Sequence, residues 1–187
     1  MSGLEMVAVA VTALAIWLTA RRHMLCWPLN VLACALYFKL FLDVRLYADM
    51  VLQALFGLAI LYGWREWARA PAQAGEAAGP VAVAPLPAAQ ALAALAAGAL
   101  GALAIGWFTS HYTDAALPWM DASLSSFSLV AQYWTARRHR ANWLLWIVLD
   151  VIYVGMFLVK GLYPTAGLYA GMTGLAVLGW RRWRAQG

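Results

Sequence analysis

The sequence contains little charge, since only 11% of its 187 residues are charged while 65% are hydrophobic. This balance lies far outside the range of soluble proteins and predicts an integral membrane protein. Cysteine is also scarce, because Cys26 and Cys34 are the only two. They share one predicted helix, and at about 1.5 Å per residue their backbones would lie roughly 12 Å apart, too far for a disulfide. We interpret both as packing residues.

Sequence motifs for catalysis and metal binding are missing as well. The chain has neither a glycine-rich phosphate loop nor a nucleophile elbow, and no Cys or carboxylate has ligand spacing to His23 or His139. We therefore expect no metal, no cofactor and no enzymatic activity. The net charge of +5 comes from short basic clusters at predicted helix ends. These clusters fit membrane topology and anionic lipid better than nucleic acid.

Long apolar segments predict an all-α protein whose helices span the membrane, because each span needs about 20 mostly apolar residues. Residues 68–87 are rich in Ala, Pro and Gly and predict a linker. The first span ends in two arginines and lacks a small-residue cleavage site, so we expect a retained helix rather than a signal peptide. The seven predicted spans cover about residues 3–20, 26–43, 46–66, 88–108, 118–136, 142–160 and 162–181.

The basic residues predict the orientation of the chain. With seven spans, ten basic residues fall on one side of the membrane and three, Lys39, Arg45 and Lys160, on the other. Because basic residues favour the cytoplasmic side, we expect the N-terminus outside and the C-terminus in the cytoplasm. The ten are Arg21, Arg22, Arg65, Arg69, Arg137, Arg138, Arg140, Arg181, Arg182 and Arg184.

The chain contains an internal repeat. Residues 19–67 align with residues 135–183 at a constant offset of 116, without a gap. Each copy contributes to three helices, an odd number, so two directly joined copies would be inverted relative to each other. The additional helix at 88–108 gives both copies the same orientation. We predict a parallel 3+1+3 arrangement, of the kind found in transporters. Residues 1–67 would form the first three-helix bundle, 88–108 a reversing helix, and 118–183 the second bundle.

Polar residues inside the predicted spans indicate a binding cavity, because such residues are costly in lipid. Asn142, Trp146, Asp150 and Tyr153 follow at helical spacing on one face, and Trp143 stands beside them. An aromatic ring and a carboxylate on a buried face would suit a flat, cationic ligand. The alternative is a structural hydrogen bond from Asp150 to a neighbouring helix.

Other spans carry further candidates for ligand contact. Most tryptophans near helix ends, including Trp64, Trp67, Trp180 and Trp183, are expected to lie in the interfacial belt. Interhelical packing is the alternative for the ligand candidates, which are Asn30, Asp49, Gln53, Phe56, Gln132 and Tyr169.

Several segments resemble the PnuC family of bacterial vitamin transporters. They include LYADMVLQ and NWLLW-x3-D, and the resemblance covers nearly the whole chain. It implies a seven-helix fold like that of the SWEET sugar transporters, a homotrimer, and a bacterial inner-membrane location. It also implies facilitated diffusion of nicotinamide riboside, which a cytoplasmic kinase then traps by phosphorylation.

The resemblance also assigns candidate substrate contacts to individual residues. The family's two glutamines correspond to Gln53 and Gln132, and its NW-x2-W motif to Asn142, Trp143 and Trp146, followed by Asp150. The chain departs from the family pattern at Asn30, where glycine is common, and at Phe56, where tyrosine is frequent. Because relatives carry thiamine or riboflavin, another vitamin is the alternative substrate. A membrane protein that binds a ligand without moving it is a third hypothesis.

Overall fold

The computed structural model describes residues 3–43, 47–70, 82–113, 117–159 and 163–185, and within these ranges every regular element is a helix. The prediction of an all-helical chain with seven helices is confirmed for the described residues. The helices are α1 (Gly3–Ala20), α2 (Cys26–Asp43), α3 (Tyr47–Ala68), α4 (Ala88–Tyr112), α5 (Pro118–Ala136), α6 (Ala141–Val159) and α7 (Tyr163–Arg184).

Most helix bounds agree closely with the apolar segments, and the largest difference is at the end of α4. The sequence predicts an end at residue 108, but α4 continues to Tyr112. Its last turn is polar, and the hydroxyl of Thr109 donates to the carbonyl of Ile105 at 2.9 Å. The hydroxyl and the backbone N–H of Thr113 both donate to the carbonyl of Thr109. Hydrogen bonding therefore continues the helix past the point where hydropathy falls.

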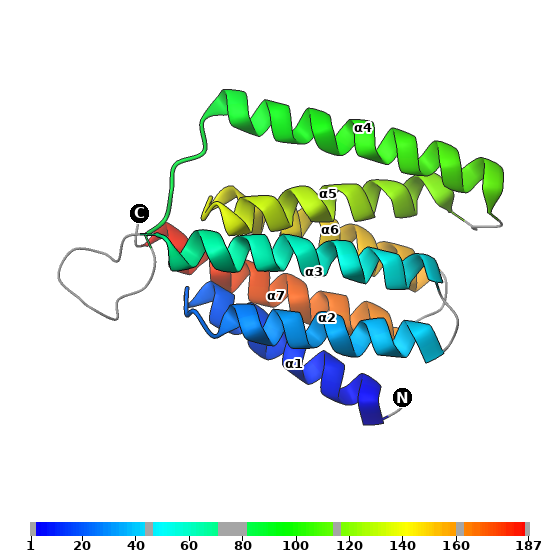
Figure 1. Cartoon of the computed structure of the whole chain (residues 1–187), viewed down its shortest axis with the longest axis horizontal. Coiled ribbons are helices and arrows are strands. Elements are labelled where there is room, and N and C mark those ends of the chain that lie inside the picture. The colour runs from blue at the N-terminus through cyan, green and yellow to red at the C-terminus, as the bar shows by residue number, and fades with distance from the viewer. Residues whose placement is uncertain (1–2, 44–46, 71–81, 114–116, 160–162, 186–187) are drawn as a thin grey trace.

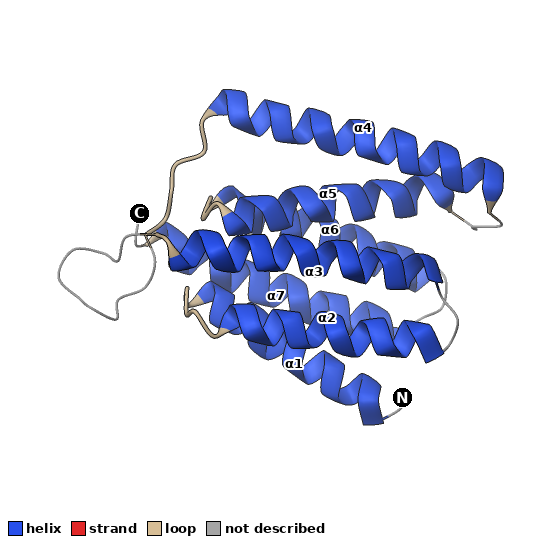
Figure 2. Ribbon diagram, in the orientation of Figure 1, coloured by secondary structure: helices blue, strands red, loops and turns tan. Residues whose placement is uncertain are grey.

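The helices lie side by side and alternate in direction, so that the two chain ends lie at opposite ends of the bundle (Figures 1 and 2). α2 contacts α1 and α3, and α6 contacts α5 and α7 in the same way. Two further contacts join these groups, α3 with α5 and α1 with α7. By length and hydropathy alone, two of the described helices, α4 and α6, are long and apolar enough to cross a membrane.

α4 lies at the edge of the bundle and packs on α5 through small residues (Figure 1). Gly98, Ala102 and Gly106 are buried at intervals of four residues along one stripe of α4. A Cβ atom at Gly106 would lie 2.4 Å from the Trp119 ring, so a larger residue would not fit without a shift. The hydroxyl of Ser126 donates to the Gly98 carbonyl at 2.8 Å. Close approach through small residues is typical of membrane helices.

Four tryptophans form a buried core at one end of the bundle. Trp27 meets Trp67 edge-on, with ring centroids 5.2 Å apart, and Trp143 meets Trp183 in the same way at 5.6 Å. All four rings are at most 2% exposed. The prediction that Trp67 and Trp183 lie in the interfacial belt is therefore wrong. Their indoles are held inside by contacts between helices, whereas Trp64 is 38% exposed.

Glycines on α3 and α7 make room for this core. A Cβ atom at Gly63 would lie 2.1 Å from the Trp27 ring, and one at Gly179 would lie 2.5 Å from the Trp143 ring. Gly63 and Gly179 occupy matched positions in the two copies of the repeat, as do the two tryptophans. The repeated sequence thus encodes a repeated contact, in which an indole packs against the helix backbone at a glycine.

Candidate substrate site

The first turn of α6 contains two predicted ligand contacts that are fully buried at the tryptophan core. The Asn142 side chain is 0% exposed, and its amide N–H donates to the His139 carbonyl at 2.7 Å. Its carbonyl oxygen has no hydrogen-bond partner among the described residues. Trp143 is 2% exposed and packs against Gly179 and Trp183. Trp143 Nε1 likewise has no hydrogen-bond partner among the described residues, so each of the two residues keeps one buried polar atom without a described partner.

Asp150 lies two turns further along α6 and is buried. Its side chain is 5% exposed. Tyr169 of α7 lies within electrostatic range of Asp150, Tyr153 and Tyr37, the last of which comes from α2. Tyr153 and Tyr169 are in ring contact, with centroids 4.6 Å apart. The structure therefore brings the predicted residues Asp150 and Tyr169 together, and it adds Tyr37 and Tyr153.

The sequence places Tyr153 on the same helix face as Asp150, but it predicts no ligand contact for Tyr153 or for its counterpart Tyr37. Their positions contain a signal that could have found them. Tyr153 stands three residues after Asp150, on the same helix face, and Tyr37 is its counterpart in the repeat. Phe157 completes the aromatic group, with its ring centroid 5.2 Å from that of Tyr169.

Trp146 lies between the tryptophan core and a second apolar cluster, and packs against both. The second cluster is formed by residues of α5 and α6, including Leu124 and Leu149. Trp146 is half-buried, unlike Trp143, so one part of its ring remains open. Of the two tryptophans in the NW-x2-W motif, Trp146 is the one with surface left for a ligand.

The remaining candidates lie on α2, α3 and α5. Gln53, Phe56 and Gln132 are half-buried, and the two glutamine amides have no hydrogen-bond partner among the described residues. Asn30 is half-buried, and its amide donates to the Cys26 carbonyl one turn earlier at 2.8 Å. The side chain of Asp49 lies outside the described residues. Among the described residues, nothing therefore competes with a polar ligand for these two amides.

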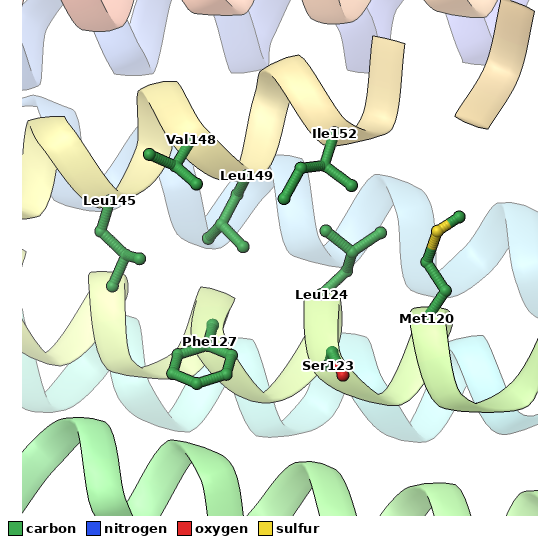
Figure 3. Close-up of a pocket in the computed structure, with 8 residues that line it drawn as sticks. All are labelled: Met120, Ser123, Leu124, Phe127, Leu145, Val148, Leu149 and Ile152. Atoms are coloured by element: carbon green, nitrogen blue, oxygen red, sulfur yellow. The ribbon is translucent and has the colours of Figure 1, made fainter. Parts of the chain in front are cut away.

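A groove of about 430 Å³ between α5 and α6 is lined almost entirely by apolar side chains (Figure 3). Its hydroxyl-bearing lining residue is Ser123, and Val148 and Ile152 are 54% and 42% exposed. None of the predicted contacts lines it. A ligand with an amide and ribose hydroxyls would find few partners there. The groove is therefore separate from the candidate site around Asp150.

The loop between α5 and α6 holds titratable groups outside the helices. Burial lowers the pKa of His139, whose Nδ1 lies 3.3 Å from the Ala84 carbonyl. The pKa of Arg137 is raised, first by a hydrogen bond with Tyr62. Among the described residues no group of three His, Cys, Asp or Glu side chains could hold a metal ion. The loop provides anchoring contacts rather than a metal centre.

A buried carboxylate surrounded by aromatic rings, inside a bundle of apolar helices, is typical of membrane proteins that handle small aromatic ligands. Comparison with known families defines this class further. The family model described as nicotinamide mononucleotide transporter matches residues 2–185, and the chain belongs to that family.

Individual relatives agree with this assignment. The nicotinamide riboside transporter PnuC of Escherichia coli is 27% identical over 98% of this chain and 85% of its own length. The riboflavin/roseoflavin transporter RibM of Streptomyces davaonensis is 28% identical over 87% of this chain and 76% of its own. The crystal structure of the vitamin B3 transporter PnuC is similar in fold, with a TM-score of 0.79, 24% identity, and coverage of 98% of this chain and 81% of the other.

Proposed function

We propose that this protein carries nicotinamide riboside across the bacterial inner membrane. The observation that supports this most is the position of Asp150, buried beside Tyr153 and Tyr169 and one turn from Trp146. Nicotinamide riboside has a flat, positively charged pyridinium ring. Aromatic faces attract such a ring, and a carboxylate offsets its charge. The E. coli relative is named for this substrate, which supports the same choice.

The riboside suits this site better than its phosphorylated form, the mononucleotide in the family's description. A phosphate adds negative charge and normally requires arginine or lysine partners. The candidate contacts described above are aromatic, amide and carboxyl groups, and Asp150 would repel a phosphate. Gln53 and Gln132 have amides available for the carboxamide and ribose hydroxyls. Asp150 would either offset the ring charge or accept hydrogen bonds from the ribose; both roles fit its position.

Transport would follow from the repeat. We propose two parallel three-helix units, residues 1–67 and 118–183, with the N-terminus outside and the C-terminus in the cytoplasm. Residues 68–87 would link the first unit to the reversing helix, which is predicted at residues 88–108. The contacts α3–α5 and α1–α7 occupy equivalent places in the two units, which supports this reading. Rocking of the units about a site near mid-membrane would move the substrate down its gradient.

The cell would keep the substrate by phosphorylating it, so transport needs no ion gradient. We also propose a homotrimer in the lipid bilayer, by analogy with the family. Neither nucleic acid, a metal nor a cofactor takes part in this function, and we propose no enzymatic activity.

Riboflavin is a second candidate, because the S. davaonensis relative is named for it. Thiamine is a third, since it is also cationic and aromatic. A protein that binds the vitamin without moving it would use the same site. Riboflavin has no cationic ring at neutral pH, so the Asp150 carboxyl favours the riboside or thiamine over it.

Calorimetric titration of the purified protein with the three vitamins tests the substrate. We expect micromolar affinity for nicotinamide riboside and at least tenfold weaker binding of thiamine and riboflavin, about 1.4 kcal/mol in binding free energy. Uptake of labelled riboside into vesicles tests transport. Tight thiamine binding without riboside binding would overturn the proposal that nicotinamide riboside is the substrate. Riboside binding without uptake would leave a binding protein instead.

A further inference from the structure

The two contacts that join the halves of the bundle are each crossed by one tryptophan hydrogen bond. At the α3–α5 contact, Trp67 Nε1 donates to the Thr135 carbonyl at 3.1 Å. At the α1–α7 contact, Trp183 Nε1 donates to the Ala20 carbonyl at 3.2 Å. Trp67 and Trp183 are counterparts in the repeat, 116 residues apart. Each half of the bundle therefore donates one indole N–H to the other half.

These hydrogen bonds form where the helix ends provide acceptors. Carbonyls in the last turn of a helix lack the regular partner four residues on, and Ala20 and Thr135 both lie in a last turn. The Thr135 carbonyl also accepts a hydrogen bond from the Arg138 N–H at 3.0 Å. An indole N–H buried without an acceptor would be costly, and both donors are buried. Because both indole N–H groups are buried, separating either one from its acceptor would be costly. The two hydrogen bonds therefore help to keep the helix ends together.

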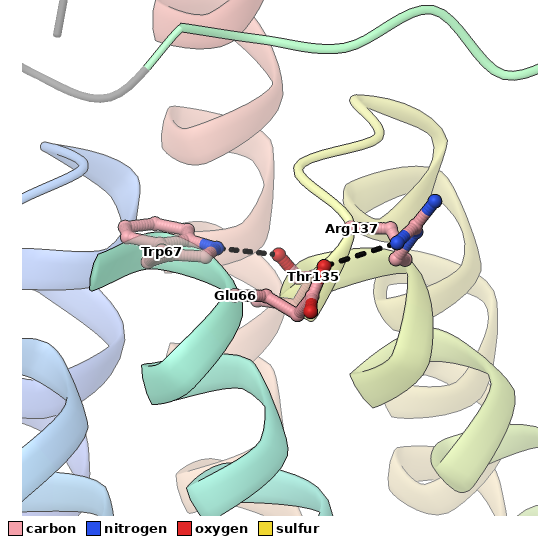
Figure 4. A network of polar contacts seen from close by, with 4 residues as sticks. All are labelled: Glu66, Trp67, Thr135 and Arg137. Carbon is pink, nitrogen blue, oxygen red and sulfur yellow. Dashed lines mark hydrogen bonds and ion pairs between the residues drawn. The ribbon is translucent and has the colours of Figure 1, made fainter. Parts of the chain in front are cut away.

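Other contacts across α3–α5 occur at the same end. Figure 4 shows the Arg137 guanidinium on the Glu66 carboxylate, 3.0 Å apart, next to the Trp67 hydrogen bond. Tyr62 and Tyr133 stack nearby, with ring centroids 6.3 Å apart. At this end α3–α5 and α1–α7 are thus joined by two indole hydrogen bonds and one ion pair. The two halves also approach each other at Tyr37 of α2 and Tyr169 of α7.

We propose that Trp67 and Trp183 form a gate, which we term the indole latch, at the cytoplasmic end of the transport path. Both hydrogen bonds must break before the halves separate there and substrate leaves. The latch couples the two contacts, because the Trp67 and Trp183 rings that make its two bonds are in contact, with centroids 6.1 Å apart. This inference rests on the transport function proposed above, but its first test needs no substrate.

A native cysteine reports on the latch. Cys26 is 1% exposed and belongs to the same core cluster as Trp67 and Trp183. In a Cys34→Ala background, the rate of Cys26 alkylation by N-ethylmaleimide measures how often this end opens. Trp67→Phe together with Trp183→Phe removes both donors and keeps two aromatic rings. Since each lost hydrogen bond shifts the equilibrium by about two- to tenfold, we expect the rate to rise at least about fivefold.

Trp64→Phe is the matched control, because Trp64 lies on the same helix as Trp67 but is 38% exposed. We expect this variant to keep the parent rate. Gel filtration and full alkylation after denaturation establish that each variant is folded and carries one reactive thiol. A double variant that reacts no faster than the Trp64→Phe control would overturn the latch, whichever vitamin the protein binds.

A covalent lock provides a second test that does not depend on weakening the core. Glu66→Cys and Arg137→Cys, in a background without Cys26 and Cys34, place two thiols across α3–α5. A short bis-methanethiosulfonate reagent should join them through two disulfide bonds and stop uptake, and reduction of those disulfides should restore it. Full uptake by the completely bridged protein would overturn the proposal. A protein that takes up no riboside even before bridging would instead refute the proposed function.

Discussion

The two copies of the repeat differ more in their middle than at their latch end. At that end Trp27, Gly63 and Trp67 of the first copy have identical counterparts, and the contacts they make are repeated as well. In the middle, Cys34 of the first copy corresponds to Asp150 of the second, and Gln53 to Tyr169. Residues that are identical in the two copies therefore form packing contacts, whereas the candidate site contains positions at which the copies differ.

The largest expected effect tests the shared packing. Trp27→Ala and Trp143→Ala should each lower the free energy of unfolding by about 3–5 kcal/mol, because each leaves a cavity in the same core. Chemical denaturation in detergent, followed by tryptophan fluorescence, measures this. If Trp143→Ala kept its stability and lost only ligand binding, Trp143 would belong to the site. Identity between the two copies would then not indicate packing alone.

The next largest effect tests the difference between the two copies at the candidate site. Asp150→Asn should lower riboside uptake on the order of a hundredfold, because the buried cationic ring loses its charge partner. Asp150→Cys, which makes the second copy match the first, should do the same. Initial uptake rates in vesicles measure both. The control is Cys34→Ala, and a similar loss in that variant would mean that the two positions contribute equally.

A smaller effect on stability is expected at Gly63 and Gly179, where the helix backbone packs against a tryptophan ring. Gly63→Ala and Gly179→Ala should each destabilise the protein by about 1–3 kcal/mol, since a Cβ atom would overlap the facing tryptophan ring. The controls are Gly57→Ala on α3 and Gly174→Ala on α7, where a Cβ atom meets nothing within 4 Å. Thermal unfolding of the four variants checks this, and equal melting temperatures would contradict it.

The smallest effect concerns the asparagine of α2. Asn30→Ala should cost about 0.5–1.5 kcal/mol, because it removes one half-buried hydrogen bond to the Cys26 carbonyl. Riboside affinity should change little if Asn30 only stabilises its own helix. Calorimetry on the stable variant measures this. A tenfold loss of affinity would place Asn30 in the site.

The sequence predicts the helices well because hydropathy directly records which segments fit a membrane. α1, α2 and α5 begin and end where the apolar segments do. α4 ends later than predicted because its polar last turn keeps backbone hydrogen bonds, such as that from the Thr113 N–H to the Thr109 carbonyl, which hydropathy does not measure. Helix ends in polar sequence therefore need contact information as well as composition.

The site was predicted less completely, because helical periodicity gives the face of a residue but not its neighbours. Asn142, Trp146 and Asp150 share a face, yet Asn142 bonds within its own first turn while Asp150 lies beside tyrosines of other helices. Trp67 and Trp183 show the same difficulty. Being close to a helix end suggested the lipid interface, whereas contacts between helices bury both rings.

The attachment of α4 determines to which half of the bundle it belongs. α4 packs on α5, and the segment before it is held by a hydrogen bond from the Ala84 N–H to the Arg138 carbonyl, in the loop after α5. Under the proposed transport motion, α4 would therefore travel with the second half. Two fragments, residues 1–70 and 82–187, expressed together should then still assemble.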